Sequence, residues 1–405
     1  MTATFTQVAT CRYVDADTGG DTGDCSSNGS PCLTINYAVS QANPGDCLNV
    51  GPGTYPEMVE VNKSLYFEGA NANKRAGVSP DARSAESIVM GFRSPGDPHP
   101  DPSYNFSVTI NGFTITPQGN VTLLSWSTYN LVSLYGGPMV RVVNNIFDGG
   151  TWNVSCWDQD DPTDPNPRVM DCKDMADSAL MIQSGNFSVL DNTFTDFRRP
   201  VDIPVWESAP SVEKLQNGLF AYNYLTHFSI RGIWLLDRYR GQVTILGNDF
   251  DGTNYDTSLY GVPAIIVESG NNSFINNIFR GMYHGVLPFI ATDYGWGPVN
   301  AEELPNTFTG NTFDGNANGI RYYWWAAANV TDVVTNNSFT NNSRYGLRSS
   351  GVVTPSNNIS AECNWWGNAS GPEINGSIPE SVSTYVNYSP WNTAPGGSCD
   401  GTPAP

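Results

Sequence analysis

Four acidic residues recur at similar places in successive stretches of this chain, each shortly after a small residue and an apolar run. They are Glu207 after Pro200, Asp237 after Gly232, Glu268 after Gly261 and Asp293 after Gly285. Pairs of carboxylates hydrolyse glycosidic bonds, at about 5–5.5 Å apart in retaining enzymes and about 6.5–9.5 Å in inverting ones. The spacing makes these acids catalytic candidates on one flank of the molecule. The alternatives are solvated turn residues or ligands of Ca²⁺.

Aromatic residues accompany these acids along the chain. They are Trp206, Trp234, Tyr239, Tyr294, Trp296, Tyr323, Trp324 and Trp325. Aromatic rings offer apolar faces on which sugar rings can lie, while carboxylates bond to sugar hydroxyls. The combination predicts a flank that binds a polysaccharide or a cell-surface glycan. The competing interpretation is that the aromatic side chains pack between loops.

Arginines lie close to the start of this acidic series. A lyase acting on a uronate needs a cation to neutralise the substrate carboxylate and a base to take a proton. Arg231 or Arg238 would supply the cation, and His227 or His284 the base. Ion pairing is the alternative role, and the candidate partners are Asp196, Asp202, Glu207 and Asp237.

A polar insertion is the strongest metal candidate. It carries Asp158, Asp160, Asp161 and Asp164, and we expect a Cys156–Cys172 disulfide to close it. Clustered carboxylates are the hard oxygen ligands that Ca²⁺ prefers, although the spacing is not that of an EF-hand. A merely acidic surface loop is the alternative. A weaker second candidate comprises Asp15, Asp17, Asp21 and Asp24.

A repeated phrase, Asn-x-Phe, indicates the elements that must position these residues. It begins at Asn145, Asn192, Asn248, Asn277, Asn311 and Asn337, with a weaker copy at Asn223. Most intervals match one coil of a β-solenoid, and the first, from Asn145 to Asn192, matches about two. We expect the Asn to occupy a turn, bonding local backbone and tolerating left-handed geometry, and the Phe to point into the core.

The chain therefore predicts an all-β, single-stranded parallel solenoid, with a β-sandwich as the competitor. Residues 1–70 should form a cap and the first coils, because Ile35, Ala38, Val39 and Ala42 have helical spacing. We expect a long loop at 71–104, coils over 105–389 with the disulfide-tied insertion at 151–177, and a tail at 390–405 that leads to a tether or a further domain.

Composition and cysteine content restrict the binding partners and the cellular compartment that we expect for the protein. Charged residues make up 14% of the chain and the net charge is −20, which argues against nucleic acid or an anionic membrane as partner. Eight cysteines lack zinc-site spacing and predict disulfides formed outside the cell. These are Cys11, Cys25, Cys32, Cys47, Cys156, Cys172, Cys363 and Cys399. Asn-x-Ser/Thr sequons, at Asn62 and Asn186 for example, are compatible with a secreted glycoprotein.

Three stretches give the chain a family resemblance. They are the N-terminal segment from Tyr13 to Leu65, the Asn-x-Phe repeats, and the closing segment Cys363-Asn364-Trp365-Trp366-Gly367 with Tyr388-Ser389-Pro390-Trp391. The chain resembles secreted right-handed parallel β-helix repeat proteins of the pectin-lyase-like superfamily. The resemblance implies a β-helix with an N-terminal helical cap. It does not imply one activity, because that superfamily includes lyases, hydrolases, epimerases and adhesins.

Two functions follow as expectations. The first is a secreted protein that binds, and as a glycoside hydrolase or lyase cleaves, a polysaccharide along the aromatic and acidic flank. The second is a non-catalytic adhesive or filament protein that self-associates or is tethered to a larger surface assembly. An ice-binding role ranks third, since it would require flat threonine arrays rather than bulky aromatic residues.

Overall fold

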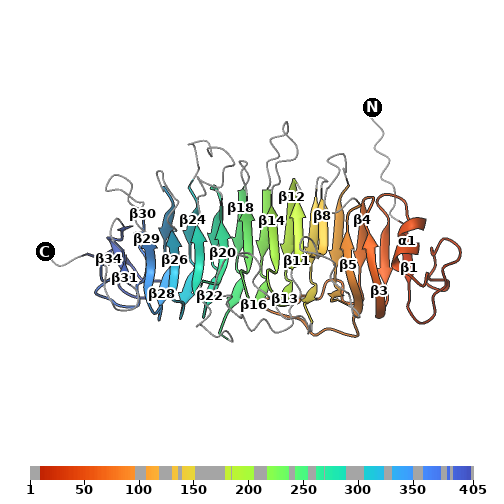
Figure 1. Cartoon of the computed structure of the whole chain (residues 1–405), viewed down its shortest axis with the longest axis horizontal. Coiled ribbons are helices and arrows are strands. Elements are labelled where there is room, and N and C mark those ends of the chain that lie inside the picture. The colour runs from red at the N-terminus through yellow and green to blue at the C-terminus, as the bar shows by residue number, and fades with distance from the viewer. Residues whose placement is uncertain are drawn as a thin grey trace, which may run out of the picture.

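The computed structural model confirms a parallel β-helix. It describes residues 10–95, 106–117, 130–135, 139–150, 178–183, 185–204, 217–236, 242–253, 261–268, 270–288, 305–322, 331–349, 359–374, 381–383 and 386–402. Its two large sheets contain 13 and 19 strands, and the strand pairs within both are parallel. Figure 1 shows the coils side by side along the long axis, from α1 near the N-terminus to β34 near the C-terminus.

Each regular coil contributes three strands, which form three rows along the stack. The first row, the 13-stranded sheet, comprises β1 (Cys11–Val14), β2 (Cys47–Val50), β4 (Leu65–Glu68), β6 (Val108–Asn111), β9 (Val140–Val143), β12 (Asn186–Leu190), β15 (Asn217–Ala221), β18 (Gln242–Leu246), β21 (Ser273–Ile275), β24 (Thr307–Thr309), β27 (Val333–Thr335), β30 (Ile359–Ser360) and β32 (Val386–Asn387).

The other two rows make up the 19-stranded sheet. The second row comprises β7 (Thr114–Ile115), β10 (Ile146–Asp148), β13 (Thr193–Phe197), β16 (Tyr224–Phe228), β19 (Asp249–Asp251), β22 (Ile278–Arg280), β25 (Thr312–Asp314) and β28 (Ser338–Thr340). The third row comprises β8 (Asn130–Tyr135), β11 (Ser178–Gln183), β14 (Val201–Pro204), β17 (Ile233–Leu236), β20 (Pro263–Val267), β23 (His284–Pro288), β26 (Asn318–Tyr322), β29 (Tyr345–Ser349) and β31 (Ser381–Val382). Two longer strands, β3 (Gly53–Glu60) and β5 (Ser87–Arg93), begin this sheet. Strand β5 lies inside the segment 71–104, for which the sequence predicts a loop.

The predicted helical cap is present as α1 (Ile35–Gln41). The Thr34 side chain accepts the Tyr37 N–H at its start. Glu57 accepts the N–H groups of Ile35 and Asn36, and Lys63 donates to the carbonyls of Val39 and Ala42 at the other end. Both charges suit the helix dipole. The helix buries Ile35, Ala38 and Val39 and thereby covers the end of the core.

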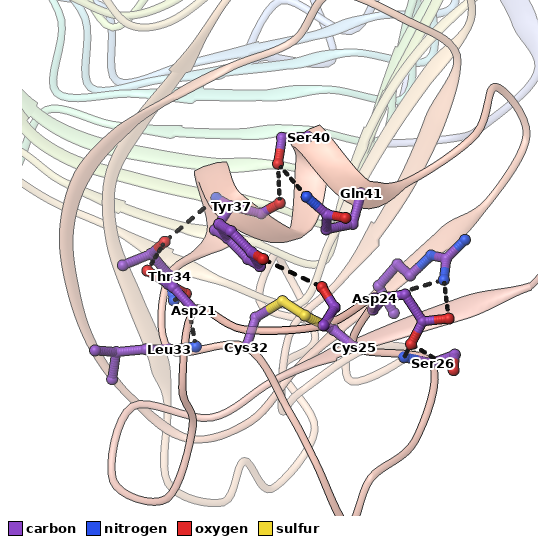
Figure 2. Close-up of a disulfide and its surroundings, with 12 residues drawn as sticks. Asp21, Asp24, Cys25, Ser26, Cys32, Leu33, Thr34, Tyr37, Ser40 and Gln41 are labelled. Carbon is purple, nitrogen blue, oxygen red and sulfur yellow. Dashed lines mark hydrogen bonds and ion pairs between the residues drawn. A yellow bond between two sulfur atoms is a disulfide. The ribbon is translucent and has the colours of Figure 1, made fainter.

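Three disulfides staple the two ends of the stack. Cys11–Cys47 joins the paired strands β1 and β2, and Cys25–Cys32 closes the loop beneath α1 (Figure 2). Cys363–Cys399 ties the last coil to the antiparallel pair β33 (Trp391–Asn392) and β34 (Cys399–Gly401). The expected Cys156–Cys172 bridge lies outside the described residues. Within the described ranges, no helix combines the length and the hydropathy needed to cross a membrane.

The repeated asparagines form a continuous hydrogen-bonded column, which we call the asparagine ladder. It runs through Asn145, Asn192, Asn223, Asn248, Asn277, Asn311, Asn337 and Asn364. At each step the Oδ1 atom accepts the backbone N–H and the side-chain N–H of the preceding member, at 2.8–3.1 Å from Asn145 to Asn192. The Nδ2 atom also donates to a carbonyl of the preceding coil, as Asn277 does to Ile245 at 2.8 Å. These asparagines thus link coils instead of only closing their own turns.

The backbone at this corner corrects one expectation. The left-handed residue is the one before each ladder asparagine, not the asparagine itself. These residues are Asn144, Asp191, Tyr222, Gly247, Asn276, Gly310, Asn336 and Cys363, with φ between 53° and 71°. The position tolerates Asn, Asp and Gly easily, but Tyr222 and Cys363 show that tertiary structure also imposes it on other residues.

The phenylalanines of the repeat point into the core, as predicted. Phe250, Phe279, Phe313 and Phe339 are fully buried, and each ring stacks on the next with centroids 4.9 Å apart. Trp366 extends the stack from Phe339 at 4.7 Å. Asn364 and Trp366 are therefore one more copy of the repeat. It does not match Asn-x-Phe because tryptophan replaces phenylalanine.

The prediction of about two coils for the first interval of the repeat, from Asn145 to Asn192, is wrong. Asn145 donates directly to Asn192, and β10 pairs with β13 with Phe147 opposite Phe194. The interval is therefore one coil and not two. Its extra length is the insertion at 151–177, which leaves the strand register unchanged. At 47 residues it is also longer than the 34-residue interval from Asn277 to Asn311.

Candidate functional site

Four of the described candidates, Arg231, Trp234, Glu268 and His284, lie on or next to strands of the third row. A methyl group added at Gly285 or Gly319 would lie 2.7 Å from the ring of Phe313 or Phe339, so these glycines face the core. The residues just before them, His284 and Asn318, therefore lie on the outer side of the sheet. The same strand register aligns a second outer column: Asp202, Trp234, Ile266, Leu287, Arg321 and Arg348.

A connected cluster occupies the start of this outer face. Arg231 lies over the Trp234 ring at 4.4 Å and donates to Asp202 at 3.0 Å. The Trp234 indole Nε1–H donates to the Glu268 carboxylate at 2.9 Å. Trp234 and Glu268 are each partly exposed, whereas Arg231 and Asp202 are buried. One aromatic ring is thus held between a guanidinium group and a carboxylate that solvent can reach.

Arg231 has the ion-pair partner that the sequence offered as the alternative to catalysis. Its guanidinium and the Asp202 carboxylate have side chains only 11% and 8% exposed. A buried arginine needs such a carboxylate because an unpaired charge there costs several kcal/mol. Through Asp202, Arg231 is fixed against Trp234, and this contact positions the ring.

The strand register changes how the acidic series is aligned. Ile233 pairs with Ile265, and Ile265 with Val286, so Gly232 corresponds to Ala264 and Gly285. Gly261, from which the sequence counted Glu268, lies three residues earlier and is not equivalent. Glu268 corresponds to Leu236, one position before Asp237.

Most of the other candidates lie outside the described residues. These are Glu207, Asp237, Arg238, Asp293, Trp206, Tyr239, Tyr294, Trp296, Tyr323, Trp324 and Trp325, together with the metal candidates Asp158, Asp160, Asp161 and Asp164. Their roles stay predictions.

The two candidate bases differ in their surroundings. His227 has a left-handed backbone, and its Nδ1 atom lies 3.7 Å from Asp196, with both side chains about 40% exposed. His284 is buried, and burial together with Arg321, Arg344 and Arg348 lowers its pKa to about 3. At neutral pH His284 is therefore uncharged.

The N-terminal aspartates are engaged in local hydrogen bonds. Asp15 accepts from Thr18. Asp24 accepts from Ser26, and Asp21 from Leu33 and Thr34 (Figure 2). Within the described ranges, no three His, Cys, Asp or Glu side chains are grouped so that they could hold a metal ion.

Comparison with known proteins gives structural likenesses alone. No family model matches the chain, and no curated protein sequence does. The chain is similar to the native structure of the GH136 lacto-N-biosidase from Eubacterium ramulus, with 12% identity and a TM-score of 0.47 over 93% of this chain and 67% of that one. For its selenomethionine derivative the TM-score is 0.35, with 12% identity over 92% and 66%. The fold assignment rests on the strand pairing described above.

Proposed function

We propose that the outer face of the third row, from β14 to β29, binds a polysaccharide outside the cell. The observation that carries the proposal is the Arg231–Trp234–Glu268 cluster. A partly exposed indole ring, held between a guanidinium group and a carboxylate, offers a sugar an apolar surface beside a hydrogen-bond acceptor. Disulfides at both ends of the stack support an oxidising compartment.

The shape of the face favours an extended ligand. Six neighbouring strands, β14, β17, β20, β23, β26 and β29, present it. At ~4.8 Å between strands the face extends for roughly 24 Å along the stack. The asparagine ladder and the aromatic stack make this support rigid, so a sugar chain would meet a preorganised surface.

Cleavage of the bound chain is the second part of the proposal. Glu268 lies at the end of β20 beside Trp234 and would be one of two catalytic carboxylates. Glu207, Asp237 and Asp293 remain the candidates for its partner. Glutamine at position 268 would keep the acceptor for the Trp234 N–H but remove the ionisable group, which separates binding from proton transfer.

A glycan array combined with a reducing-end release assay tests both parts. If the protein is a hydrolase, Glu268→Gln should bind the same glycans as wild type and release reducing ends at least about 100-fold more slowly. Asp237→Asn tests the proposed partner in the same assay. Binding without release by wild type would reject the enzyme. Absence of both would leave the adhesive or filament role.

A further inference from the structure

Three arginines gather at the C-terminal part of the same face. Arg321 on β26 and Arg348 on β29 occupy the same register on paired strands. Parallel strands lie ~4.8 Å apart, so two like charges stand side by side, an arrangement that is unfavourable by itself. Arg344 precedes β29 and is exposed, whereas Arg321 and Arg348 are partly exposed. This concentration of positive charge contrasts with the net charge of −20 for the chain.

Aromatic rings, not carboxylates, hold two of these arginines. Arg344 donates to the Tyr283 hydroxyl at 2.6 Å and lies over its ring at 5.2 Å, while Arg348 lies over Tyr345 at 5.1 Å. In the described part of the chain, neither has a carboxylate within 4.0 Å. Six other described arginines do make ion pairs with acids: Arg12, Arg75, Arg83, Arg93, Arg231 and Arg280.

A neutral histidine orients the third arginine. Arg321 contacts the His284 Nε2 atom at 3.3 Å, and the Asn318 amide contacts Nδ1 at 3.1 Å. Arginine only donates hydrogen bonds, so Nε2 must accept and Nδ1 carries the proton. The Asn318 Oδ1 atom has no other partner and is available to accept that proton once the amide is turned to face it. His284 thus orients Arg321 without cancelling its charge.

We infer that Tyr283, His284, Arg321, Arg344 and Arg348 form a subsite for an anionic group carried by the sugar chain, a carboxylate or a sulfate ester. Guanidinium groups bind both oxyanions through paired N–H donors, and the aromatic contacts of Arg344 and Arg348 leave their positive charge for the ligand. The inference rests on the proposed function, because it names the substrate class of the same face. Trp234 and Arg321 are three strand spacings apart, roughly 14 Å, within reach of one extended chain.

The test compares charged sugars with their neutral counterparts. An oligouronate and its carboxyl-reduced form, and a sulfated oligosaccharide and its desulfated form, are titrated into wild type and Arg344→Gln/Arg348→Gln. We expect at least one anionic sugar to bind wild type about tenfold more tightly than its neutral form. The double variant should lose that advantage and keep its affinity for the neutral form. Added salt should weaken binding of the anion only.

Arg141→Gln is the matched control. Arg141 is exposed on β9, in the first row, so its loss removes positive charge from a different sheet. It should leave every affinity unchanged. Equal effects of the control and the double variant would overturn the subsite, as would equal affinities of charged and neutral sugars for wild type. In both cases the proposed function stands if neutral sugars bind. Failure of every sugar to bind would overturn both.

Discussion

The asparagine corner and the outer face of the third row are built in opposite ways. At the corner asparagine repeats in every coil from Asn145 to Asn364, and the side chains of successive asparagines are bonded to each other. On the outer face the residue changes at each step from Asp202 through Trp234, Ile266 and Leu287 to Arg321, and it repeats once, at Arg348. Repetition supplies a stack whose neighbouring coils support each other, and the proposed binding residues lie where the repetition is absent. Substitutions at the corner should therefore change stability, and those on the face should change binding.

The largest effect on stability is expected from a substitution in the asparagine ladder. Asn277→Ala would leave the N–H groups of Asn248 and the Ile245 carbonyl without partners in a dry interior. At about 1–3 kcal/mol for each unsatisfied group, we expect the free energy of unfolding to fall by about 3–5 kcal/mol. Urea unfolding measures it. Asn28→Ala, at an exposed turn, should change it by less than about 0.5 kcal/mol. Equal losses would contradict a structural role for the ladder.

A second, shorter ladder contains an acid where an amide would fit. Asn272 bonds to Asn306, whose N–H is accepted by the buried Asp332, and Tyr322 donates to the same carboxyl group. Burial raises the pKa of Asp332 from 3.8 to about 6. Because the pKa of Asp332 is higher in the folded state than in the unfolded state, its contribution to the free energy of unfolding is fully present below pH 4. That contribution is lost as the pH rises through 6.

Asp332→Asn should therefore stabilise the protein only above that range. We expect a gain of roughly 1–3 kcal/mol at pH 8 and almost none at pH 4, because the amide stays neutral and accepts the same bond from Asn306. Urea midpoints at the two pH values measure this. The exposed Asp17→Asn is the control, with little change at either pH. A gain of equal size at pH 4 would show that charge burial is not the cause.

The sequence repeats were enough to predict the β-helix scaffold. They were not enough to predict which residues meet on the outer face of the third row. The Asn-x-Phe copies gave the coils and the core-facing rings, because each coil must solve the same packing problem at the same corner. The interval that contains the 151–177 insertion was predicted to be two coils and is one, since a loop can lengthen without moving the strands that it joins. Glu268 was aligned from Gly261, because a turn glycine and the core-facing Ala264 cannot be told apart without the strand pairing.

No repeated pattern in the sequence indicates the subsite residues. His284, Arg321 and Arg348 are brought together by pairing of β23, β26 and β29, and they are separated along the chain by whole coils. The role of Arg231 as a candidate cation stays a prediction. The structure gives it Asp202 as a partner, the ion pair that the sequence left open as the alternative.

The most direct test of the central claim is the affinity of Trp234→Ala for a neutral glycan that binds wild type. Trp234 lies on the outer face, where side chains are predicted to serve binding more than folding. We predict an affinity at least about tenfold lower, equivalent to about 1.4 kcal/mol, with a cooperative unfolding transition retained. Trp234→Phe, which keeps a ring, should lose less. Unchanged affinity in Trp234→Ala would contradict the assignment of glycan binding to this face.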